Sequence, residues 1–226
     1  ADSAARHDVM IVNNKADLLR EVERLWEQKS IFHNRKHSRL VIQEYIVGEE
    51  YYINSTRIDG HDYVGGIFKY RKEEKRTFGA YNVDEHDKKQ IEAMISFNKT
   101  CLDALKVEYG MTHNEYIFDK NNIPYLIEMN NRMVGSEVPE LSQYCYHADE
   151  ITIFLDALEN KEIHEFDYKK IFARGAVAYF CNFSTPNATT MDYSGLISPY
   201  KQIAFRPGLI QKNEGSNELF IGVSSG

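Results

Sequence analysis

The residue types best suited to catalysis in this sequence lie in one predicted β-hairpin. If the two asparagines at 121–122 form its turn, which asparagine allows because it tolerates positive φ, the flanking strands pair antiparallel. Glu115 then faces Glu128, and His113 faces Asn130. Two carboxylates, an amide and an imidazole are therefore predicted to meet in one small region.

Side chains alternate between the two faces of a strand, so this hairpin should have one polar face and one apolar face. The residues predicted to share the polar face are His113, Glu115, Glu128, Asn130 and Arg132. The residues predicted to share the apolar face are Tyr116, Phe118, Tyr125, Ile127 and Met129. The alternative is a solvated edge hairpin, on which Glu, Asn and Arg are common surface residues.

A cation would resolve the repulsion between the two facing glutamates. Opposed carboxylates in water-poor surroundings take up a proton unless a cation lies between them. Oxygen ligands alone, from Glu115, Glu128 and Asn130, fit Mg²⁺, which keeps water and phosphate oxygens in its remaining positions. Two ions about 3.5 to 4 Å apart that share one carboxylate can neutralise a triphosphate and its transferring group. Glu128 is placed to be that bridge, and Mn²⁺ could replace Mg²⁺.

The composition argues against several classes of partner. Lys and Arg total 27 against 34 Asp and Glu, a net charge of −7, so neither a nucleic-acid footprint nor a polybasic membrane patch is expected. No apolar run approaches the roughly 20 residues of a membrane helix. The three cysteines are scattered without a CxxC motif, which indicates buried reduced thiols in a cytoplasmic protein. A small-molecule or protein partner is favoured, and a homo-oligomer remains open.

Hydrophobic periodicity predicts the elements around this hairpin. Apolar residues at helical spacing predict helices at 15–29, 88–106 and 149–158. The apolar side of the last helix is predicted to consist of Ile151, Phe154, Leu155 and Leu158. Runs rich in β-forming residues predict strands at 39–46, 50–58, 63–70, 112–118, 123–130 and 176–183, with short strands near 202–206 and 219–223. Asp59-Gly60 is predicted to be a hairpin turn, and the charged run 71–76 a solvated loop.

The run Tyr125–Arg132 (Tyr-Leu-Ile-Glu-Met-Asn-Asn-Arg) closely resembles the metal-binding strand of the ATP-grasp superfamily. The resemblance implies that Glu115, Glu128 and Asn130 bind two magnesium ions. It also implies that Arg132 holds the carboxylate or acyl-phosphate side of the reaction, as the catalytic arginine.

Two upstream segments resemble nucleotide-binding parts of the same family. The run 41–51 is similar to the adenine-binding hinge. The residues that this similarity assigns to adenine or ribose are Glu44, Tyr45, Ile46 and Glu50. The run 2–9 lies where the family has a flexible phosphate-covering loop, which would place Ser3 and Ala4 at the nucleotide.

Within the superfamily, the Tyr-Arg-Lys run at 70–72 looks most like the L-amino-acid ligases. On the substrate side, His113, Gly135 and Ser136 would contact the substrate. A structural histidine and a simple turn are the competing interpretations. Biotin carboxylases share the Glu-Met-Asn-x-Arg motif but continue with Gln-Val-Glu-His, whereas this chain has Met-Val-Gly-Ser-Glu at 133–137.

The resemblance implies an α+β fold of the ATP-grasp type, in which two small α+β subdomains with mainly antiparallel sheets clasp ATP. It divides the chain into the end of the first subdomain (1–46), the second subdomain with the magnesium site (47–160), and a β-rich extension or lid (161–226). The family's N-terminal substrate domain and two nucleotide-contacting lysines are expected ahead of residue 1. The chain is therefore expected to be a fragment of a longer protein.

The implied activity is that of an ADP-forming carboxylate–amine ligase, which makes a peptide-type bond through an acyl phosphate. Its cofactors would be ATP and magnesium, and its substrates a small carboxylate, an amino acid by this resemblance, and an amine. The competing interpretations are an ATP-grasp carboxylase or carbamoyl-phosphate-type enzyme, and a degenerate ATP-binding module without catalysis.

Overall fold

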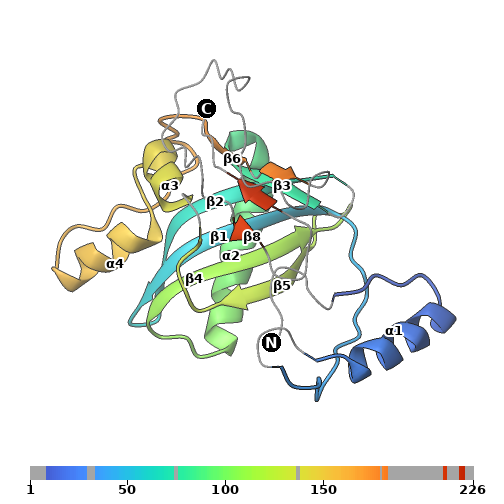
Figure 1. Cartoon of the computed structure of the whole chain (residues 1–226). Helices are drawn as coiled ribbons and strands as arrows, with labels where there is room; N and C mark the ends of the chain where they lie inside the picture. The colour runs from blue at the N-terminus through green and yellow to red at the C-terminus, as the bar shows by residue number, and fades with distance from the viewer. Residues whose placement is uncertain are drawn as a thin grey trace. The chain divides into compact units, whose positions relative to one another are not determined.

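The computed structural model of the chain describes residues 9–29, 34–73, 76–135, 138–178, 180–182, 211–212 and 219–221 (Figure 1). The chain divides into two compact units, Ala1–Ile46 and Val47–Gly226. No helix in the described ranges is long and apolar enough to cross a lipid bilayer.

The described part of the first unit contains the helix α1 (Lys15–Glu27). Its N-cap is Asn14, whose side-chain oxygen accepts a hydrogen bond from the backbone N–H of Asp17 at 2.9 Å. This bond satisfies one of the donors that a helix start leaves unpaired. The helix predicted at 15–29 is confirmed.

The strand predicted at 39–46 is wrong. Residues 39–47 form neither helix nor strand, and the side chains of Val41, Ile42 and Tyr45 are exposed. A strand needs a neighbour for its backbone hydrogen bonds, and no described strand pairs with this segment. The preference of β-branched and aromatic residues for strands is too weak to replace that neighbour.

The second unit is built on a six-stranded sheet in which every neighbouring pair is antiparallel. Its strands in chain order are β1 (Glu49–Ile58), β2 (His61–Glu73), β3 (Arg76–Asn82), β4 (Gly110–Phe118), β5 (Pro124–Asn130) and β6 (Ala176–Ala178). They lie side by side in the order β5-β4-β1-β2-β3-β6, so β5 is an edge strand. The α+β fold with a mainly antiparallel sheet is thus confirmed.

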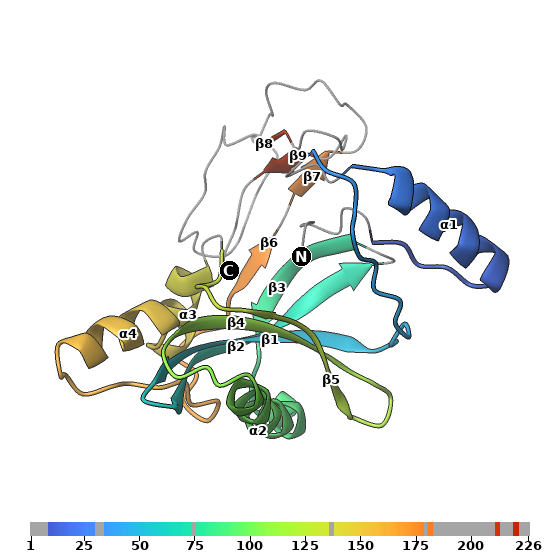
Figure 2. The same cartoon turned by 90° about the horizontal axis from the view of Figure 1, so that it is seen from below.

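Helices cover both faces of this sheet (Figure 2). The helices of this unit are the 3₁₀ turn η1 (Glu85–Asp87), α2 (Lys88–Ala104), α3 (Val138–Tyr146) and α4 (Glu150–Leu158). α2 packs on one face, where Asn98 hydrogen-bonds to Asn114 and Tyr116 of β4. α3 and α4 pack on the other face, where the hydroxyl of Thr56 in β1 donates to the carbonyl of Glu150. Fully buried core side chains include Tyr51, Ile53, Ile67, Ile91, Met94 and Tyr116.

The turn between β1 and β2 forms where it was predicted. Asp59 and Gly60 both have positive φ, of 50° and 74°, as a two-residue hairpin turn requires. The loop predicted at 71–76 is wrong, because residues 71–73 continue β2 and Arg76 begins β3. Pairing between β2 and β3 supplies hydrogen bonds that the charged sequence alone does not indicate.

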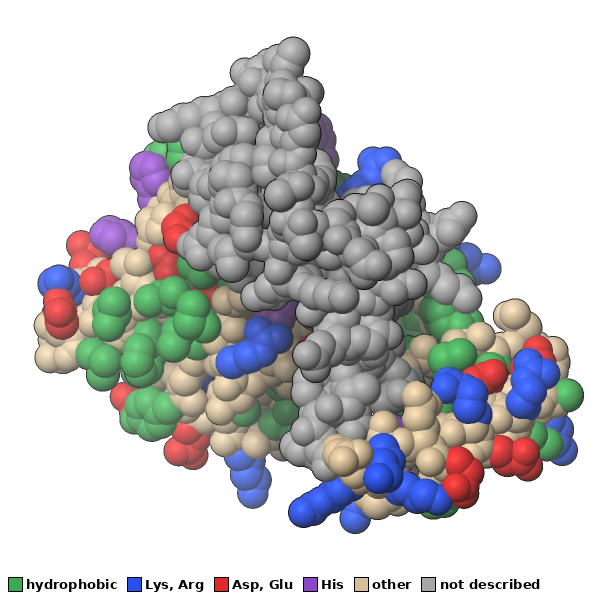
Figure 3. All heavy atoms as spheres, viewed as in Figure 1, with side chains coloured by type: hydrophobic (Ala, Val, Ile, Leu, Met, Phe, Trp, Pro, Cys, Tyr) green, Lys and Arg blue, Asp and Glu red, His purple; other side chains and the backbone are tan. Residues whose placement is uncertain are grey.

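The helix predicted at 149–158 is confirmed, but its buried side is not the predicted one. α4 buries Glu150 and Ile153, whereas Leu155 and Leu158 are exposed. Apolar side chains accordingly gather over α4 on the face seen in Figure 3. The packing of the helix on the sheet, and not its hydrophobic pattern, therefore decides which side is buried. This packing places the carboxyl group of Glu150 in the core.

The remaining described strands form a second, three-stranded sheet in the order β7-β9-β8. These strands are β7 (Phe180–Asn182), β8 (Gln211–Lys212) and β9 (Leu219–Ile221). The strand predicted at 202–206 lies outside the described residues. Of the cysteines predicted to be buried thiols, Cys145 is buried and Cys101 is partly exposed, and both are free.

Candidate active site

The β4–β5 hairpin brings the predicted pairs together. Glu115 pairs with Glu128 and His113 pairs with Asn130 in the antiparallel register. The two glutamates therefore face each other on the same side of the sheet, as the sequence predicted. This juxtaposition is the structural basis of the candidate site.

The turn that produces this register differs from the prediction. The N–H of Asp119 donates to the carbonyl of Ile123 at 3.1 Å, and Asn122, with φ of 60°, donates to the carbonyl of Asp119 at 2.9 Å. The loop is thus longer than two residues. A register shift between Glu115 and Tyr116 compensates for the longer loop, so the glutamates still meet.

The same shift changes the predicted apolar face of β5. Leu126, rather than Ile127, pairs with the buried Tyr116, and Tyr125 pairs with Ile117 rather than with Phe118. The side chains of Leu126 and Ile127 are about two-fifths exposed, because β5 is at the edge of the sheet. The prediction that Tyr125 shares the face of Tyr116 is therefore wrong.

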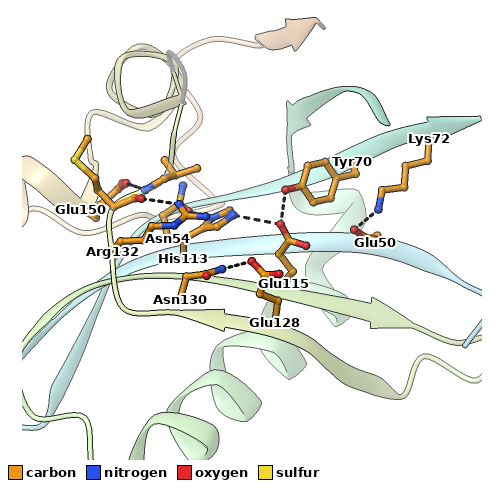
Figure 4. A network of polar contacts seen from close by, with 12 residues as sticks. Glu50, Asn54, Tyr70, Lys72, His113, Glu115, Glu128, Asn130, Arg132 and Glu150 are labelled. Carbon is orange, nitrogen blue, oxygen red and sulfur yellow. Dashed lines mark hydrogen bonds and ion pairs between the residues drawn. The ribbon is translucent and has the colours of Figure 1, made fainter. Parts of the chain in front are cut away.

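Glu115 lies at the centre of a network of polar contacts (Figure 4). Its Oε1 accepts a hydrogen bond from the hydroxyl of Tyr70 at 2.7 Å and lies 3.3 Å from Nε2 of His113. The other ring nitrogen of His113, Nδ1, contacts the side-chain oxygen of Asn54 at 2.8 Å. These contacts join strands β1, β2 and β4 around one carboxyl group.

The network favours the ionised form of Glu115. Burial alone would raise the pKa of its carboxyl, but the hydrogen bonds from His113 and Tyr70 and the positive charges of His113 and Lys72 outweigh that effect. The net result is a pKa below the ordinary value for glutamate. Glu115 can therefore act as an anionic ligand at neutral pH.

A lysine that the sequence assigned to a solvated loop lies on the same face. Lys72 is in β2, where its ammonium forms an ion pair with Glu50 and lies 5.0 Å from the centre of the Tyr70 ring. Glu50 was predicted to bind ribose. Strand alternation on β1 places Glu50 on the side that also carries Asn54, so the nucleotide-binding and metal-binding predictions meet on one sheet face (Figure 4).

Tyr70, Lys72 and Asn54 were not among the predicted site residues. Two features could have indicated them. The side chains of β2 go on alternating between the two faces of the sheet through the charged run, and Asn54 pairs with His113. That pairing joins residues far apart in the chain, so it is not readable from local periodicity.

The residues predicted to bind magnesium fit a hard cation by their chemistry. Both contacts of Glu115 reach Oε1, and no hydrogen bond in the described part of the chain reaches its Oε2. The amide nitrogen of Asn130 donates to the carboxylate of Glu128, so the amide oxygen of Asn130 points away from that carboxylate. Within the described ranges, no cluster of three or more His, Cys, Asp or Glu side chains is arranged to hold a metal ion. An ion here would thus depend on the amide oxygen and on phosphate or water.

Arg132 lies in the loop that follows β5. It is exposed, and its Nη1 donates to the carbonyl of Met133 at 2.9 Å. Val134, two residues after Arg132, donates its backbone N–H to the carboxyl of Glu150 at 3.0 Å. At Gly135 an added Cβ would meet no atom within 4 Å, so this part of the loop borders open space.

The other predicted nucleotide residues are not part of this network. Glu44, Tyr45 and Ile46 belong to the first compact unit, in the segment without regular structure. Ser3, Ala4 and the predicted substrate residue Ser136 lie outside the described residues. Their roles remain predictions.

Comparison with solved structures decides the fold. The L-amino acid ligase from Bacillus licheniformis is similar over 80% of this chain and 47% of that chain, with a TM-score of 0.63 and 16% sequence identity. The biotin carboxylase domain of 2-oxoglutarate carboxylase from Hydrogenobacter thermophilus covers 78% of this chain and 39% of its own, with a TM-score of 0.62 and 15% identity. This chain has the ATP-grasp fold.

The ATP-grasp fold predicted from the hairpin motif is thus confirmed. Among curated proteins, dapdiamide A synthase from Enterobacter agglomerans is 21% identical over 159 residues, which are 69% of this chain and 37% of that protein. No family model matches the sequence. The chain therefore spans less than half the length of these ATP-grasp relatives.

Proposed function

We propose that this chain supplies the nucleotide and metal site of an ADP-forming carboxylate–amine ligase. The observation that carries the proposal is the pairing of Glu115 with Glu128 beside Asn130, on the sheet face that also carries Glu50 and Lys72. Two facing carboxylates, one of them held ionised by its neighbours, suit a site that binds divalent cations and a triphosphate.

In this proposal, ATP and magnesium bind on that face. Glu115, Glu128 and Asn130 would hold one or two magnesium ions, which Mn²⁺ could replace, and Glu50 would accept from the ribose hydroxyls. The ions, when bound, supply positive charge that offsets the phosphate oxygens. Residues proposed for the adenine and phosphates are Glu44, Tyr45, Ile46, Ser3 and Ala4.

The proposed reaction has two steps. A carboxylate oxygen of the substrate attacks the γ-phosphorus of ATP, the bond to the β-phosphate oxygen breaks, and an acyl phosphate and ADP form. The amine nitrogen then attacks the acyl carbon, phosphate leaves, and the nitrogen loses a proton. Neither step needs a protein nucleophile, so catalysis would come from positioning and charge stabilisation.

Arg132 would hold the reacting carboxylate. A guanidinium can form two parallel hydrogen bonds to a planar carboxylate, which a lysine cannot. The similarity to an L-amino acid ligase and to dapdiamide A synthase supports an amino acid as the carboxylate substrate and an amine as the acceptor. His113, Gly135 and Ser136 are proposed to border the substrate.

The test is magnesium-dependent ADP release by the protein in its natural length, with amino acids supplied singly and in pairs. Release that requires a carboxylate and an amine together is expected. The Glu128→Gln variant should lose roughly two to three orders of magnitude of this activity, because it removes a carboxylate that would hold the magnesium ion whose charge offsets the phosphate oxygens. Glu140→Gln, a change at an exposed glutamate of α3, is the matched control and should retain it.

A second candidate is an ATP-grasp carboxylase. It is favoured by the TM-score of 0.62 with a biotin carboxylase domain whose structure contains ADP, magnesium and bicarbonate. ADP release that depends on bicarbonate and on no amino acid would establish this reaction and reject the ligase. Tight ATP binding without turnover under every condition would instead indicate a binding module.

A further inference from the structure

A buried glutamate close to the site, Glu150, has no role in the proposed reaction. It is the first residue of α4, and its side chain is fully buried. Burial raises the pKa of its carboxyl above the ordinary value. A carboxyl group in the core is costly unless its oxygens are matched by donors, so its partners indicate what it does.

One oxygen of this carboxyl holds the loop that follows β5 (Figure 4). Oε1 of Glu150 accepts a hydrogen bond from the backbone N–H of Val134 at 3.0 Å. Val134 is buried, so water is poorly placed to replace the carboxyl if it is removed. The carbonyl of the same peptide group belongs to Met133, and it accepts from Nη1 of Arg132 at 2.9 Å.

The planarity of that peptide links Glu150 to Arg132. The N–H and the C=O of a trans peptide lie in one plane and point in opposite directions. When Glu150 fixes the direction of the Val134 N–H, it also fixes the Met133 carbonyl to which the guanidinium is bonded. Arg132 is otherwise an exposed, long side chain with many rotamers, so this carbonyl restricts where its guanidinium lies.

Glu150 is itself anchored to the sheet. Its backbone carbonyl accepts from the hydroxyl of Thr56 in β1 at 2.6 Å. Gly65 of β2 allows the start of α4 to approach, because an added Cβ there would overlap the backbone of Asp149 and Glu150. The side chain of Asp149 caps α4 by accepting from the backbone of Ile151. These contacts fix the backbone position from which the side chain of Glu150 extends.

We propose that Glu150 is a positioning residue that orients Arg132 toward the reacting carboxylate through the Met133–Val134 peptide. This inference rests on the proposed function, which gives Arg132 its carboxylate-binding role. It goes beyond that function by predicting that α4, which carries none of the proposed ligands, controls the use of the carboxylate substrate. Nucleotide binding should be insensitive to this residue.

The first test compares Glu150→Ala with Glu150→Gln in the steady-state kinetics of the protein in its natural length. The alanine variant loses the acceptor, so the KM for the carboxylate should rise about tenfold or more, with the KM for ATP within about twofold of wild type. The glutamine variant keeps an oxygen at the same reach and should stay close to wild type. Equal impairment of both variants, or equal changes in both KM values, would overturn the proposal.

The second test asks whether the effect passes through Arg132. In an Arg132→Ala background, Glu150→Ala should cause no further rise in the carboxylate KM, since the group being positioned is absent. Additive effects would reject the link. If Glu150→Ala does not fold, Glu150→Asp replaces it in both tests, because the shorter side chain withdraws the acceptor while it keeps a carboxyl group.

Amide hydrogen exchange separates this inference from the proposed function. The peptide that contains residues 131–135 should exchange faster in Glu150→Ala than in wild type, while peptides from β1 should not. This measurement needs no substrate, so it tests the peptide anchor even if no ligase activity is found. Unchanged exchange at 131–135 would remove the basis of the proposal.

Discussion

Replacing Tyr70 with phenylalanine removes one hydrogen bond from the Glu115 carboxylate and leaves the aromatic ring in place. The lost bond is the one from the Tyr70 hydroxyl to Oε1, at 2.7 Å. The ring, whose centre lies 4.8 Å from that of Tyr52, can keep its packing. The change in stability therefore reports mainly on the hydrogen bond.

The expected magnitude follows from the charge and burial of Glu115. A hydrogen bond to a charged group contributes about 1.5 to 3 kcal/mol, and its loss raises the pKa of the carboxyl because the ionised form loses a donor. The Glu115 side chain is only 19% exposed, so solvent screens this interaction little. The pKa of Glu115 should rise in the variant, and the free energy of unfolding near pH 7 should fall by that amount.

The pH dependence gives the sign of the effect. The pKa of Glu115 is lower in the folded protein than in the unfolded chain, because its hydrogen bonds and neighbouring positive charges outweigh burial. The stability that this difference provides is present above the unfolded pKa and is lost as the pH falls through the folded pKa. The gap between wild type and Tyr70→Phe should therefore be largest near neutral pH and shrink in acid.

The assay is urea unfolding of the wild type and of the variant at a series of pH values from about 7 to about 3. Tyr168→Phe is the matched control, because the Tyr168 hydroxyl bonds to the exposed carboxyl of Glu92 at 3.0 Å. That variant should change the free energy of unfolding by less than about 0.5 kcal/mol. A Tyr70→Phe effect that is equally large at both ends of the pH range would refute the reasoning, since the hydroxyl would then act independently of the ionised Glu115.

Two further predictions concern the scaffold beneath the site. Asn98→Ala should lower the free energy of unfolding by about 3 kcal/mol or more, because it leaves the buried Tyr116 and Asn114 and the partly buried Asp62 without their hydrogen bonds to Asn98. Urea unfolding checks this, with Thr100→Ala at an exposed position as the control. Gly65→Ala should destabilise by about 1 to 3 kcal/mol, because its Cβ would overlap the start of α4; a thermal midpoint equal to that of wild type would contradict this close approach.

Much of the hairpin could be predicted from its sequence, for a physical reason. Side chains on a strand alternate with a period of two, so a turn between two such runs nearly fixes which residues share a face. The pairing of Glu115 with Glu128 followed from this rule. The assumed two-residue turn was wrong, yet the pairing was right, because a register shift in β5 compensated for the longer loop.

Where a prediction depended on partners far along the chain, it failed. The run 39–46 has strand-forming residues but no described strand beside it. In the charged run 71–76, residues 71–73 and Arg76 are strand because β2 and β3 pair there. The same long-range pairing placed Lys72 on the face of Glu50 rather than in solvent. Neither outcome is encoded in local hydrophobic periodicity.

The sequence by itself determined the helices α1, α2 and α4, the polar face of the β4–β5 hairpin and the pair of glutamates, because these depend on residue types at short, regular spacing, whereas α3 was not predicted. Only the tertiary structure decided which neighbours surround those glutamates. Tyr70 reaches Glu115 across 45 residues of chain, and Thr56 reaches Glu150 across 94. Contacts at such separations depend on how the sheet and helices pack as a whole, so a buried acid at the start of α4 is found by its packing and not by its pattern.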